Sequence, residues 1–423
     1  MRHRAPFLLL TAVLITVPRV SDAQESRGVR IPADMHYLAD DRLEGRGTGT
    51  PGAELAADYI SHRFQEIGLR SAPGSTGWFQ NYVVSAHSAG GEGSSAAGQT
   101  ARNVLGMIVG TDPDHADEYI VVGAHYDHLG RGGRGSLDPD SVGVVHNGAD
   151  DNASGVVALL DVARRLSLQP PALSVLFIAF SGEELGLLGS TVYVKAPSVP
   201  MEQVRAMLNF DMVGRLREDK LIVYGVETAT EFRPILDSLN GRHRFALSAQ
   251  GGGYGPSDQT SFTVAGRPVL HFFTGTHTDY HRTTDDWEKI NYEGIKRVAS
   301  FATDVVRAMA QRPSLTFVDS PPPPAPSGES RTSGYGAYLG TVPDMSENPG
   351  GVLLSGVRAG GPADLAGITG GDIIIKIGDH DVPDLQGMTD ALRAYAPGDV
   401  VEIVIRRGDA ERTVTVTLGR RGG

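Results

Sequence analysis

The chain has 423 residues, of which 40% are hydrophobic, with no cysteine and a formal net charge of −12. The lack of cysteine excludes disulfides, thiolate catalysis and thiolate metal sites, so any metal must be held by His, Asp and Glu. The acidic balance argues against nucleic acid as a partner, because binding it needs clustered Lys and Arg. The length exceeds that of one ordinary domain, and we therefore expect two folded bodies.

The chain begins with a basic start and an apolar run from Ala5 to Val17, followed by the polar exit SDAQ. This pattern is typical of a cleaved secretory signal over residues 1–23, with the cut after Ala23. The run is short for a bilayer span, and no later segment is as apolar. We therefore expect an exported protein, periplasmic or extracellular, with no membrane span after signal cleavage. An uncleaved signal that serves as an anchor is the alternative.

Helices and strands alternate in the first part of the chain. An amphipathic helix is predicted over Ala53–Leu69, and a loop rich in Ser, Gly and Ala over Ser85–Gln99. A second helix is predicted over Val156–Leu166, with Ser154 as its N-cap. Three apolar runs have strand length: Tyr119–Ala124, Val175–Phe180 and Ala206–Phe210. This alternation predicts an α/β fold with a mostly parallel sheet covered by helices on both faces.

The composition changes near Pro313, where the sequence reads PSLTFVDSPPPPAPSGES. A run of prolines followed by Ser and Gly predicts an extended, semi-rigid linker over residues 313–333. Beyond it, four short β-rich runs and helices near Pro362–Ala366 and Leu385–Tyr395 predict a small β-rich domain over residues 334–420. The first domain then covers residues 32–312.

Ionisable residues follow each apolar run of the first domain directly, and two loops add more. The strand ends carry AHYD, FSGEE and NFDMVG, and the loops carry GADDNASG and DYHRTTDD; the residues are His125, Asp127, Asp150, Asp151, Glu183, Glu184, Asp211, His281 and Asp285. Taken singly, each has an ordinary structural explanation, such as a turn, a helix cap or a solvated charge. Three of the motifs, however, stand at the same end of neighbouring strands, which is where such sheets bind ligands.

That many carboxylates in one cleft would repel each other strongly in a low-dielectric pocket. Divalent cations remove the conflict, and a mixture of histidine and carboxylate suits zinc or a harder transition metal. One metal would be crowded, so the pattern favours two metals that share a carboxylate and lower the pKa of a water between them. Of the adjacent Glu183 and Glu184, one can then bind metal while the other serves as general base.

The motifs GAHYDH, GADDNASG, SGEELGLLGS, NFDMVG and DYHRTTDD, in this order, resemble those of the secreted bacterial di-zinc aminopeptidases, relatives of the transferrin-receptor-like and glutamate carboxypeptidase proteins. The upstream stretch LADDRLEGRGTGTPGAELAADYI is also similar, so the resemblance covers about Pro32 to Arg312. It implies a zinc exopeptidase fold that holds two zinc ions. The implied ligands are His125 and Asp211 at one zinc, Glu184 and His281 at the other, and Asp151 as the bridge between them.

The resemblance also implies roles for residues that bind no metal. Glu183 would be the general base that deprotonates the bridging water and passes the proton to the leaving amine. Asp127 would orient His125, and the peptide bond from Asp151 to Asn152 would be cis. Two neighbours of His281 complete the site. Tyr280 matches a donor to the oxyanion, with packing beside the site as the equal alternative, and His277 is expected to support the ligands or line the pocket.

These residues predict an aminopeptidase that acts on peptides with a free N-terminus. A glutaminyl cyclase on the same fold is the alternative from another enzyme class, although it uses one zinc. A carboxypeptidase or dipeptidase would need an arginine cluster for the substrate carboxylate, which the sequence does not place. An inactive peptidase body that serves as a scaffold is the non-enzymatic alternative.

The C-terminal segment resembles a PDZ domain of the bacterial periplasmic-protease type. AYLGT, at Ala337–Thr341, stands where the carboxylate-binding loop belongs, and Leu385–Tyr395 would form the helix beside the groove. Such a groove captures C-terminal peptides by adding them as a strand to a sheet edge. A PDZ domain that packs on the catalytic body, or acts as a spacer, is the alternative.

Overall fold

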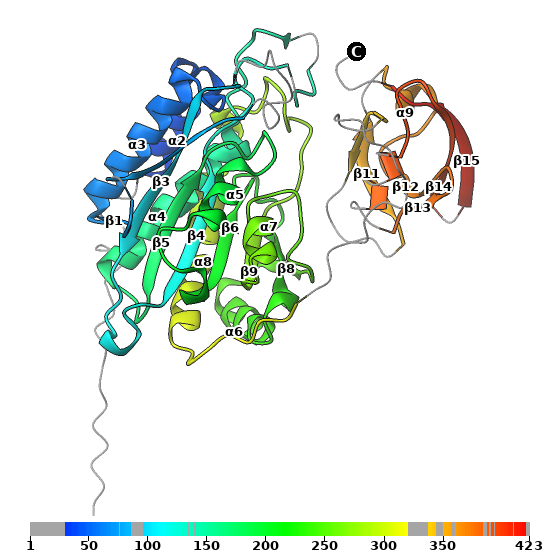
Figure 1. Ribbon diagram of the computed structural model, residues 1–423. Coiled ribbons are helices and arrows are strands. Elements are labelled where there is room, and N and C mark those ends of the chain that lie inside the picture. Colours follow the sequence, from blue (N-terminus) through cyan, green and yellow to red (C-terminus); the bar gives the residue numbers. More distant parts are fainter. Residues whose placement is uncertain are drawn as a thin grey trace, which may run out of the picture.

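The structure is a computed structural model that describes residues 30–419, except for 76, 86–95, 134, 139–140, 320–336, 344–349, 358–359, 384–386, 389–390, 393 and 409. The predicted signal, most of the loop predicted over Ser85–Gln99 and most of the predicted linker lie outside the described residues. Figure 1 shows a large α/β body and a small β-rich body. None of the helices in the described part of the chain has the length and apolar character that crossing a membrane requires.

The large body is built on a nine-stranded sheet with the order β1-β3-β5-β4-β6-β9-β7-β8, in which β2 also pairs with β3. Its strands are β1 (Arg70–Ser71), β2 (Phe79–Val83), β3 (Thr100–Ile108), β4 (Tyr119–His125), β5 (Ser174–Phe180), β6 (Val204–Phe210), β7 (Lys220–Tyr224), β8 (Ala246–Ala249) and β9 (Val269–Phe273). The central strands β5, β4, β6 and β9 run parallel. The pairings of β1, β2 and β5 with β3, and of β7 with β9, are antiparallel, so the sheet as a whole is mixed.

Helices cover both faces of this sheet, as predicted (Figure 1). They are α2 (Ile31–Leu38), α3 (Pro51–Ile67), α4 (Gly155–Leu168), α5 (Leu188–Lys195), α6 (Phe232–His243), α7 (Gln259–Val264) and α8 (Tyr292–Ala310). Successive residues of β5 alternate between the two cores. Phe177 packs in the core formed with α2, α3, α4, α6 and α8, whereas Ile178 packs in the core formed with α5 and α7. Burial on both faces explains the continuous apolar runs of the central strands.

The entry to α4 differs from the prediction. Ser154 makes no side-chain cap; its hydroxyl donates to the carbonyl oxygen of Asp150 (2.7 Å) and accepts from the N–H of Val213 (2.9 Å). The chain approaches α4 through the turn Ala149–Ser154, in which Asp151 and Asn152 have non-helical backbone angles, whereas Ser154 already has helical ones. Its side chain therefore ties this turn to the end of β6 rather than capping the helix.

The small body is a six-stranded antiparallel sheet with the order β10-β11-β12-β14-β15, in which β13 pairs with β12. The elements are β10 (Thr341–Pro343), β11 (Val352–Val357), α9 (Pro362–Leu365), β12 (Ile373–Ile377), β13 (His380–Asp381), β14 (Val400–Arg407) and β15 (Ala410–Thr417). The four predicted β-rich runs correspond to β11, β12, β14 and β15. Its own buried core, which includes Leu354, Ile374 and Ile403, is separate from the cores of the large body.

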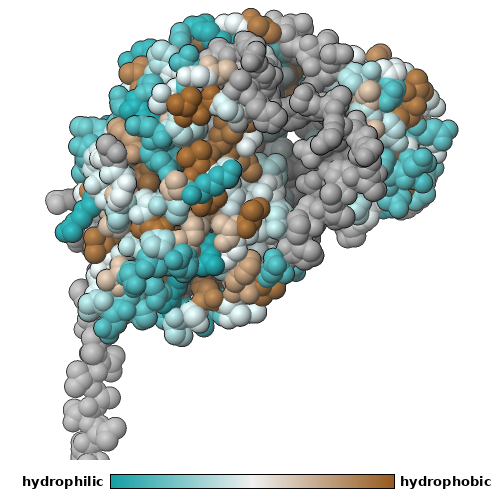
Figure 2. Space-filling view, in the orientation of Figure 1, coloured by the Kyte–Doolittle hydropathy of each residue, from teal (hydrophilic) through white to brown (hydrophobic). Residues whose placement is uncertain are grey.

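The described residues show where the predicted linker starts and one hydrogen bond between the two bodies. Residues 316–318, at the start of the predicted linker, lie along the large body, where Phe317 forms a bridge with Ala229. The hydroxyl of Thr276, in the loop after β9, donates to the carbonyl oxygen of Pro343 in β10 (2.8 Å). Figure 2 shows hydrophobic and hydrophilic residues mixed over the visible face of the large body, as expected for a folded protein, much of whose surface is apolar.

Candidate metal centre

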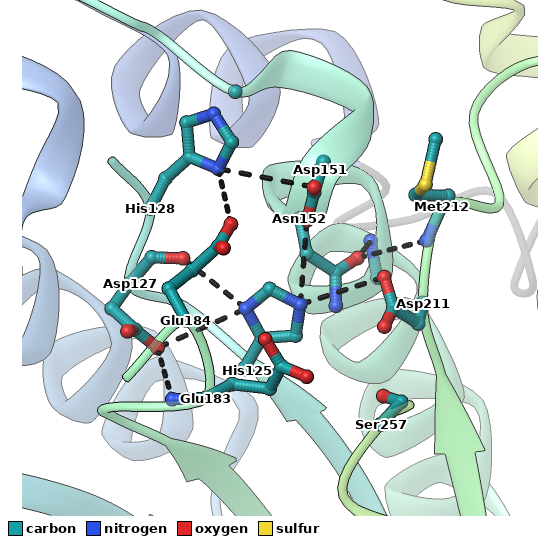
Figure 3. Close-up of polar contacts among 12 residues, drawn as sticks. His125, Asp127, His128, Asp151, Asn152, Glu183, Glu184, Asp211, Met212 and Ser257 are labelled. Atoms are coloured by element: carbon teal, nitrogen blue, oxygen red, sulfur yellow. Dashed lines mark hydrogen bonds and ion pairs between the residues drawn. The ribbon is translucent and has the colours of Figure 1, made fainter. Parts of the chain in front are cut away.

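The ends of three neighbouring parallel strands place five of the predicted site residues. β4 ends at His125, with Asp127 two residues later; the turn after β5 carries Glu183 and Glu184; and Asp211 follows β6 directly. The predicted convergence of these side chains is observed, and Figure 3 shows most of them in one close-up. Parallel strands direct their carboxyl ends to the same edge of the sheet, which is why motifs far apart in the sequence meet there.

The turn after β5 separates the two glutamates. Gly182 has a φ of +74°, a conformation that favours glycine, and the chain reverses there before α5 begins. A side chain at Gly189 would meet Asn103 Oδ1 and the carbonyl oxygen of Ser181, both 2.3 Å from its Cβ, so α5 lies close against the turn. Figure 3 shows the carboxylate of Glu184 pointing toward His128 and that of Glu183 beside the ring of His125. The adjacent charges therefore occupy different parts of the site.

Asp151 lies between two groups of ligand-type side chains. Its Oδ1 is 3.4 Å from His125 Nε2, which is also 3.4 Å from Asp211 Oδ1. Its Oδ2 is 3.1 Å from His281 Nε2, which is 3.3 Å from Glu184 Oε2. The two oxygens of one carboxylate thus face the two sets of residues that the resemblance assigned to two metals.

The segment that carries Asp151 is held by hydrogen bonds from both sides. Asp285 Oδ2 accepts from the N–H groups of Asp150 (2.9 Å) and Asp151 (3.0 Å). The side chain of Asn152 donates to the carbonyl oxygen of Phe210 (2.9 Å) at the end of β6. The peptide bond from Asp151 to Asn152 is cis, as the resemblance implied. Asp151 is therefore tied to the strand end that carries Asp211.

Asp127 has different partners from those expected. His125 Nδ1 lies 3.2 Å from the backbone carbonyl oxygen of Asp127 and 3.8 Å from its carboxylate, a separation beyond hydrogen-bond range. The carboxylate instead accepts from the N–H of Glu183 (3.2 Å) and the hydroxyl of Thr48 (2.7 Å). The backbone of Asp127 thus contacts the histidine, while its side chain supports the turn that carries the two glutamates.

Tyr280 and His277 lie on the loop that carries His281. The ring of Tyr280 stacks on that of His281, with centroids 3.9 Å apart, and partly packs against Met212, Ile222 and Phe273. His277 Nε2 is 3.0 Å from Asp150 Oδ2, so this histidine contacts a neighbour of Asp151. These contacts support the alternative that Tyr280 packs beside the site, and its role as an oxyanion donor stays a prediction.

Two residues of this region were missed by the sequence interpretation. His128, the last residue of GAHYDH, places Nδ1 2.8 Å from Glu184 Oε1, and it forms a group of ligand-type atoms with Glu184 and Asp151. Arg46, in the LEGRGTG stretch, is almost wholly buried. Its guanidinium donates to the carbonyl oxygens of Tyr126 (2.7 Å), Asn147 (2.6 Å), Gly148 (2.9 Å) and Leu38. Both residues lie in motifs that the sequence analysis quoted, which could have drawn attention to them. The hydrogen-bond partners of His128 and Arg46, however, are, apart from Leu38, distant in the sequence and cannot be predicted from the neighbouring residues.

The electrostatics of the site reflect an excess of buried negative charge. Burial raises the pKa of Glu183 well above its usual range, and neighbouring Glu184 adds to the rise. Burial lowers the pKa of His125, but Asp211 and Glu183 outweigh it and hold that pKa well above its usual range. Burial also lowers the pKa of His281, but the carboxylate of Glu184 outweighs it and holds that pKa well above its usual range. Imidazole nitrogens and carboxylate oxygens in such a cluster fit zinc, which would supply positive charge.

Comparison with known proteins identifies two regions of the chain. Residues 103–306 match the model of peptidase family M28, and residues 337–418 match that of the PDZ domain. The chain is 30% identical over 236 residues to the alkaline phosphatase isozyme conversion protein of Escherichia coli (strain K12), covering 56% of this chain and 65% of the relative. It is 31% identical over 229 residues to aminopeptidase YwaD of Bacillus subtilis (strain 168), covering 49% and 44%. The chain thus spans less than two thirds of either relative.

Solved structures share the fold of the large body. An aminopeptidase from Aneurinibacillus sp. strain AM-1 superposes with a TM-score of 0.51 at 19% identity, covering 70% of this chain and 96% of that one. A glutaminyl cyclase from Bacteroides thetaiotaomicron superposes with a TM-score of 0.52 at 18% identity, covering 66% and 98%. At these identities the likeness establishes the fold and nothing further. The sequence matches supply the family of each body: residues 103–306 form a region of peptidase family M28, and residues 337–418 form a PDZ domain.

Proposed function

We propose that this chain is an exported, zinc-dependent aminopeptidase that removes N-terminal residues from peptides with a free N-terminus. The observation that carries the proposal is the position of Asp151, whose Oδ1 and Oδ2 lie 3.4 Å from His125 Nε2 and 3.1 Å from His281 Nε2. A carboxylate shared in this way supports a site for two metals, with Asp211 on the side of His125 and Glu184 on the side of His281.

Two zinc ions held by these residues would supply Lewis-acid polarisation of the substrate carbonyl and a water of lowered pKa. Glu183 is assigned to neither proposed metal and can therefore move protons. Its carboxylate lies beside the ligand His125 (Figure 3), and it takes a proton from the attacking water. The water oxygen bonds to the carbonyl carbon, the C–N bond breaks, and Glu183 returns the proton to the leaving amine.

The charges around the site favour attack at the N-terminal end of a substrate. Buried carboxylates can hold an α-ammonium group, whereas a carboxypeptidase needs free arginine. Three arginines around the site are engaged: Arg46 with backbone carbonyls, Arg215 with Asp279 (3.0 Å) and Asp285 (3.5 Å), and Arg282 with Asp138 (2.7 Å). None of the three is free to bind a substrate carboxylate.

The proposal is tested with aminoacyl and N-blocked aminoacyl chromogenic substrates, each with and without chelator. We expect hydrolysis of the free-amine compounds only, with loss on chelation and recovery with zinc. Hydrolysis of the blocked compounds would contradict aminopeptidase action. Cyclisation of peptides that begin with Gln, together with one zinc per chain by metal analysis, would favour the cyclase alternative, whose fold this chain shares.

The PDZ domain is proposed to bind peptide C-termini. Leu339 and Gly340, with a φ of +80° at Gly340, precede β10, which stands at one end of the described strand order. A strand added at that edge would bring its terminal carboxylate toward the loop before β10. Fluorescence anisotropy with peptide libraries tests this proposal. Amidation of the C-terminus should abolish binding, and equal binding of free and amidated peptides would contradict it.

Export is proposed from the N-terminal residues 1–23 alone. Cell fractionation with N-terminal sequencing of the mature chain tests it, and a chain that starts at Gln24 is expected. An uncleaved chain in the membrane fraction would favour the anchor alternative.

A further inference from the structure

His128 contacts the candidate metal centre in a way that the site residues assigned so far leave unexplained. Its Nδ1 lies 2.8 Å from Glu184 Oε1 and 4.0 Å from Asp151 Oδ2 (Figure 3). The ring is buried, and Nε2 has no hydrogen-bond partner among the described residues. A buried imidazole normally satisfies both nitrogens, whereas this ring, among the described residues, makes its hydrogen bond through Nδ1 to Glu184 alone.

The surroundings of His128 hold its ring in place. Its backbone N–H donates to the carbonyl oxygen of Arg46 (3.2 Å). The ring meets that of His281 edge to face, with centroids 5.6 Å apart and an interplanar angle of 73°. Gly148 lies against the other part of the ring, where an added Cβ would be 2.4 Å from His128 Cδ2. A ring confined on these sides directs Nδ1 at Glu184 without freedom to turn away.

The two oxygens of Glu184 have different neighbours. Oε1 contacts His128 Nδ1 at 2.8 Å, whereas Oε2 lies 3.3 Å from His281 Nε2. His281 Nε2 is also 3.1 Å from Asp151 Oδ2, so Oε2 belongs with the atoms that face a shared centre. His128 belongs to a group of ligand-type atoms with Glu184 and Asp151, but its Nδ1 is 4.0 Å from the same Asp151 oxygen, farther than the 3.1 Å of His281 Nε2. One oxygen of Glu184 is thus taken by His128, and the other is free to bind metal.

We propose that His128 is a positioning residue, which donates its Nδ1–H to Glu184 Oε1 and so presents Oε2 to the second zinc. This inference rests on the proposed function, because it explains how a ligand of one of the two proposed zinc sites is held in place. A histidine nitrogen and an ionised carboxylate oxygen approach to 2.8 Å only with a proton between them. Nδ1 as a metal ligand would move that proton to Nε2 and leave a buried N–H without an acceptor, which is uncommon for buried side-chain polar groups. Removing a group that holds a metal ligand in this way typically lowers metal affinity about 10–100-fold.

The test compares two substitutions in the full-length chain. H128N keeps an N–H donor close to the position of Nδ1 but is a poor zinc ligand, and H128L removes donor and ligand together. Zinc dissociation constants of both sites are measured by competition with a chromogenic chelator, and the ligand field is monitored with Co²⁺. As a control, H243N removes a histidine that also pairs with a carboxylate, Asp304 at 2.9 Å, away from the site.

We expect H128L to lower the affinity for one of the two zinc ions about 10–100-fold and to leave the affinity for the other unchanged. H128N should stay within about threefold of the parent, with an unaltered Co²⁺ spectrum, as should H243N. Equal losses in H128N and H128L, with a changed Co²⁺ spectrum, would overturn the inference and make Nδ1 a metal ligand. Unchanged zinc affinity in H128L would overturn it as well.

Failure of this inference is distinguishable from failure of the proposed function, because the readout is metal affinity. A parent chain that binds two zinc ions but hydrolyses no aminoacyl substrate would refute the activity and leave the role of His128 standing. An active aminopeptidase whose H128L variant binds zinc normally would refute only the role of His128. Circular dichroism of each metal-free variant shows that the chain is folded, so a weakened site is not mistaken for an unfolded one.

Discussion

Replacing Arg46 with methionine should weaken both the fold and the metal centre. The guanidinium serves four backbone carbonyls: those of Leu38, Tyr126, Asn147 and Gly148. Tyr126 lies between His125 and Asp127, and Gly148 precedes the segment that carries Asp151. One buried side chain thus joins the two stretches of backbone that supply ligands to both proposed metals. Burial lowers the pKa of Arg46 to about 10, partly offset by Asp127 and Asp151, so the side chain remains charged at neutral pH.

The magnitude follows from the number of groups left unpaired. Each buried carbonyl without a donor costs about 1 kcal/mol or more, and relief of the buried charge offsets part of the total, so we expect R46M to lose about 3–5 kcal/mol of unfolding free energy. R46K keeps the charge but has three donors for four carbonyls and lacks the planar geometry. Its expected loss is about 1–2 kcal/mol.

Thermal unfolding in the presence of chelator separates the fold from metal binding. For a body of this size, about 2–4 °C is lost per kcal/mol, so R46M should unfold roughly 10 °C below the parent. R42M is the matched control, because the side chain of Arg42 is 74% exposed and pairs with the nearby Asp40 at the surface. Zinc affinity of both sites should fall in R46M and not in R42M. An R46M variant that unfolds within about 2 °C of the parent would refute this reasoning.

Three further predictions concern the catalytic base, the shared carboxylate and the PDZ domain. E183Q should retain its zinc by metal analysis while kcat falls by about 10²–10⁴-fold; near-normal turnover would assign the base elsewhere. D151N should lose affinity for both zinc ions in chelator competition, because the two oxygens of Asp151 face His125 and His281 respectively. D211N should mainly weaken the zinc site of His125. Loss of only one zinc ion in D151N would exclude a bridging role for Asp151. In the PDZ domain, hydrogen bonds from Arg407 (2.6 Å) hold the pKa of Asp372 below its usual value. The stability that this interaction contributes is therefore present above the unfolded-state pKa of Asp372 and is lost as pH falls through its folded-state pKa. Calorimetry of the full chain should show this acid-dependent loss in the PDZ transition of the parent and not of D372N, and an equal loss in both would contradict it.

Much of the fold was predictable because its signals are local. Continuous apolar runs marked β4, β5 and β6, since strands buried on both faces need apolar residues at every position. The ends of those strands identified His125 and Asp211, because ionisable residues directly after a buried strand are conspicuous. The antiparallel pairings around β3 were not predicted, since strand direction depends on how distant segments meet in the sheet.

The partners of individual polar groups were the part that local sequence did not reveal. Ser154 had the residue type and position of an N-cap, yet its hydroxyl bonds to the backbone of Asp150 and Val213. Asp127 was expected to orient His125, yet its carboxylate contacts Glu183 and Thr48. In each case a group had several chemically equivalent partners available, and packing chose among them.

The sequence by itself determined the class of the fold, the two bodies and the residue types gathered at one edge of the sheet, because periodicity, composition and motif order are properties of short segments. The tertiary structure decided how the carboxylate oxygens are shared: Asp151 between His125 and His281, and Glu184 between His128 and His281. It also placed Arg46 on carbonyls that are 80 to 102 residues further along the chain. The physical reason is that such contacts form only when buried strands and helices bring distant backbone within a few ångströms, where direction and desolvation select one partner from many.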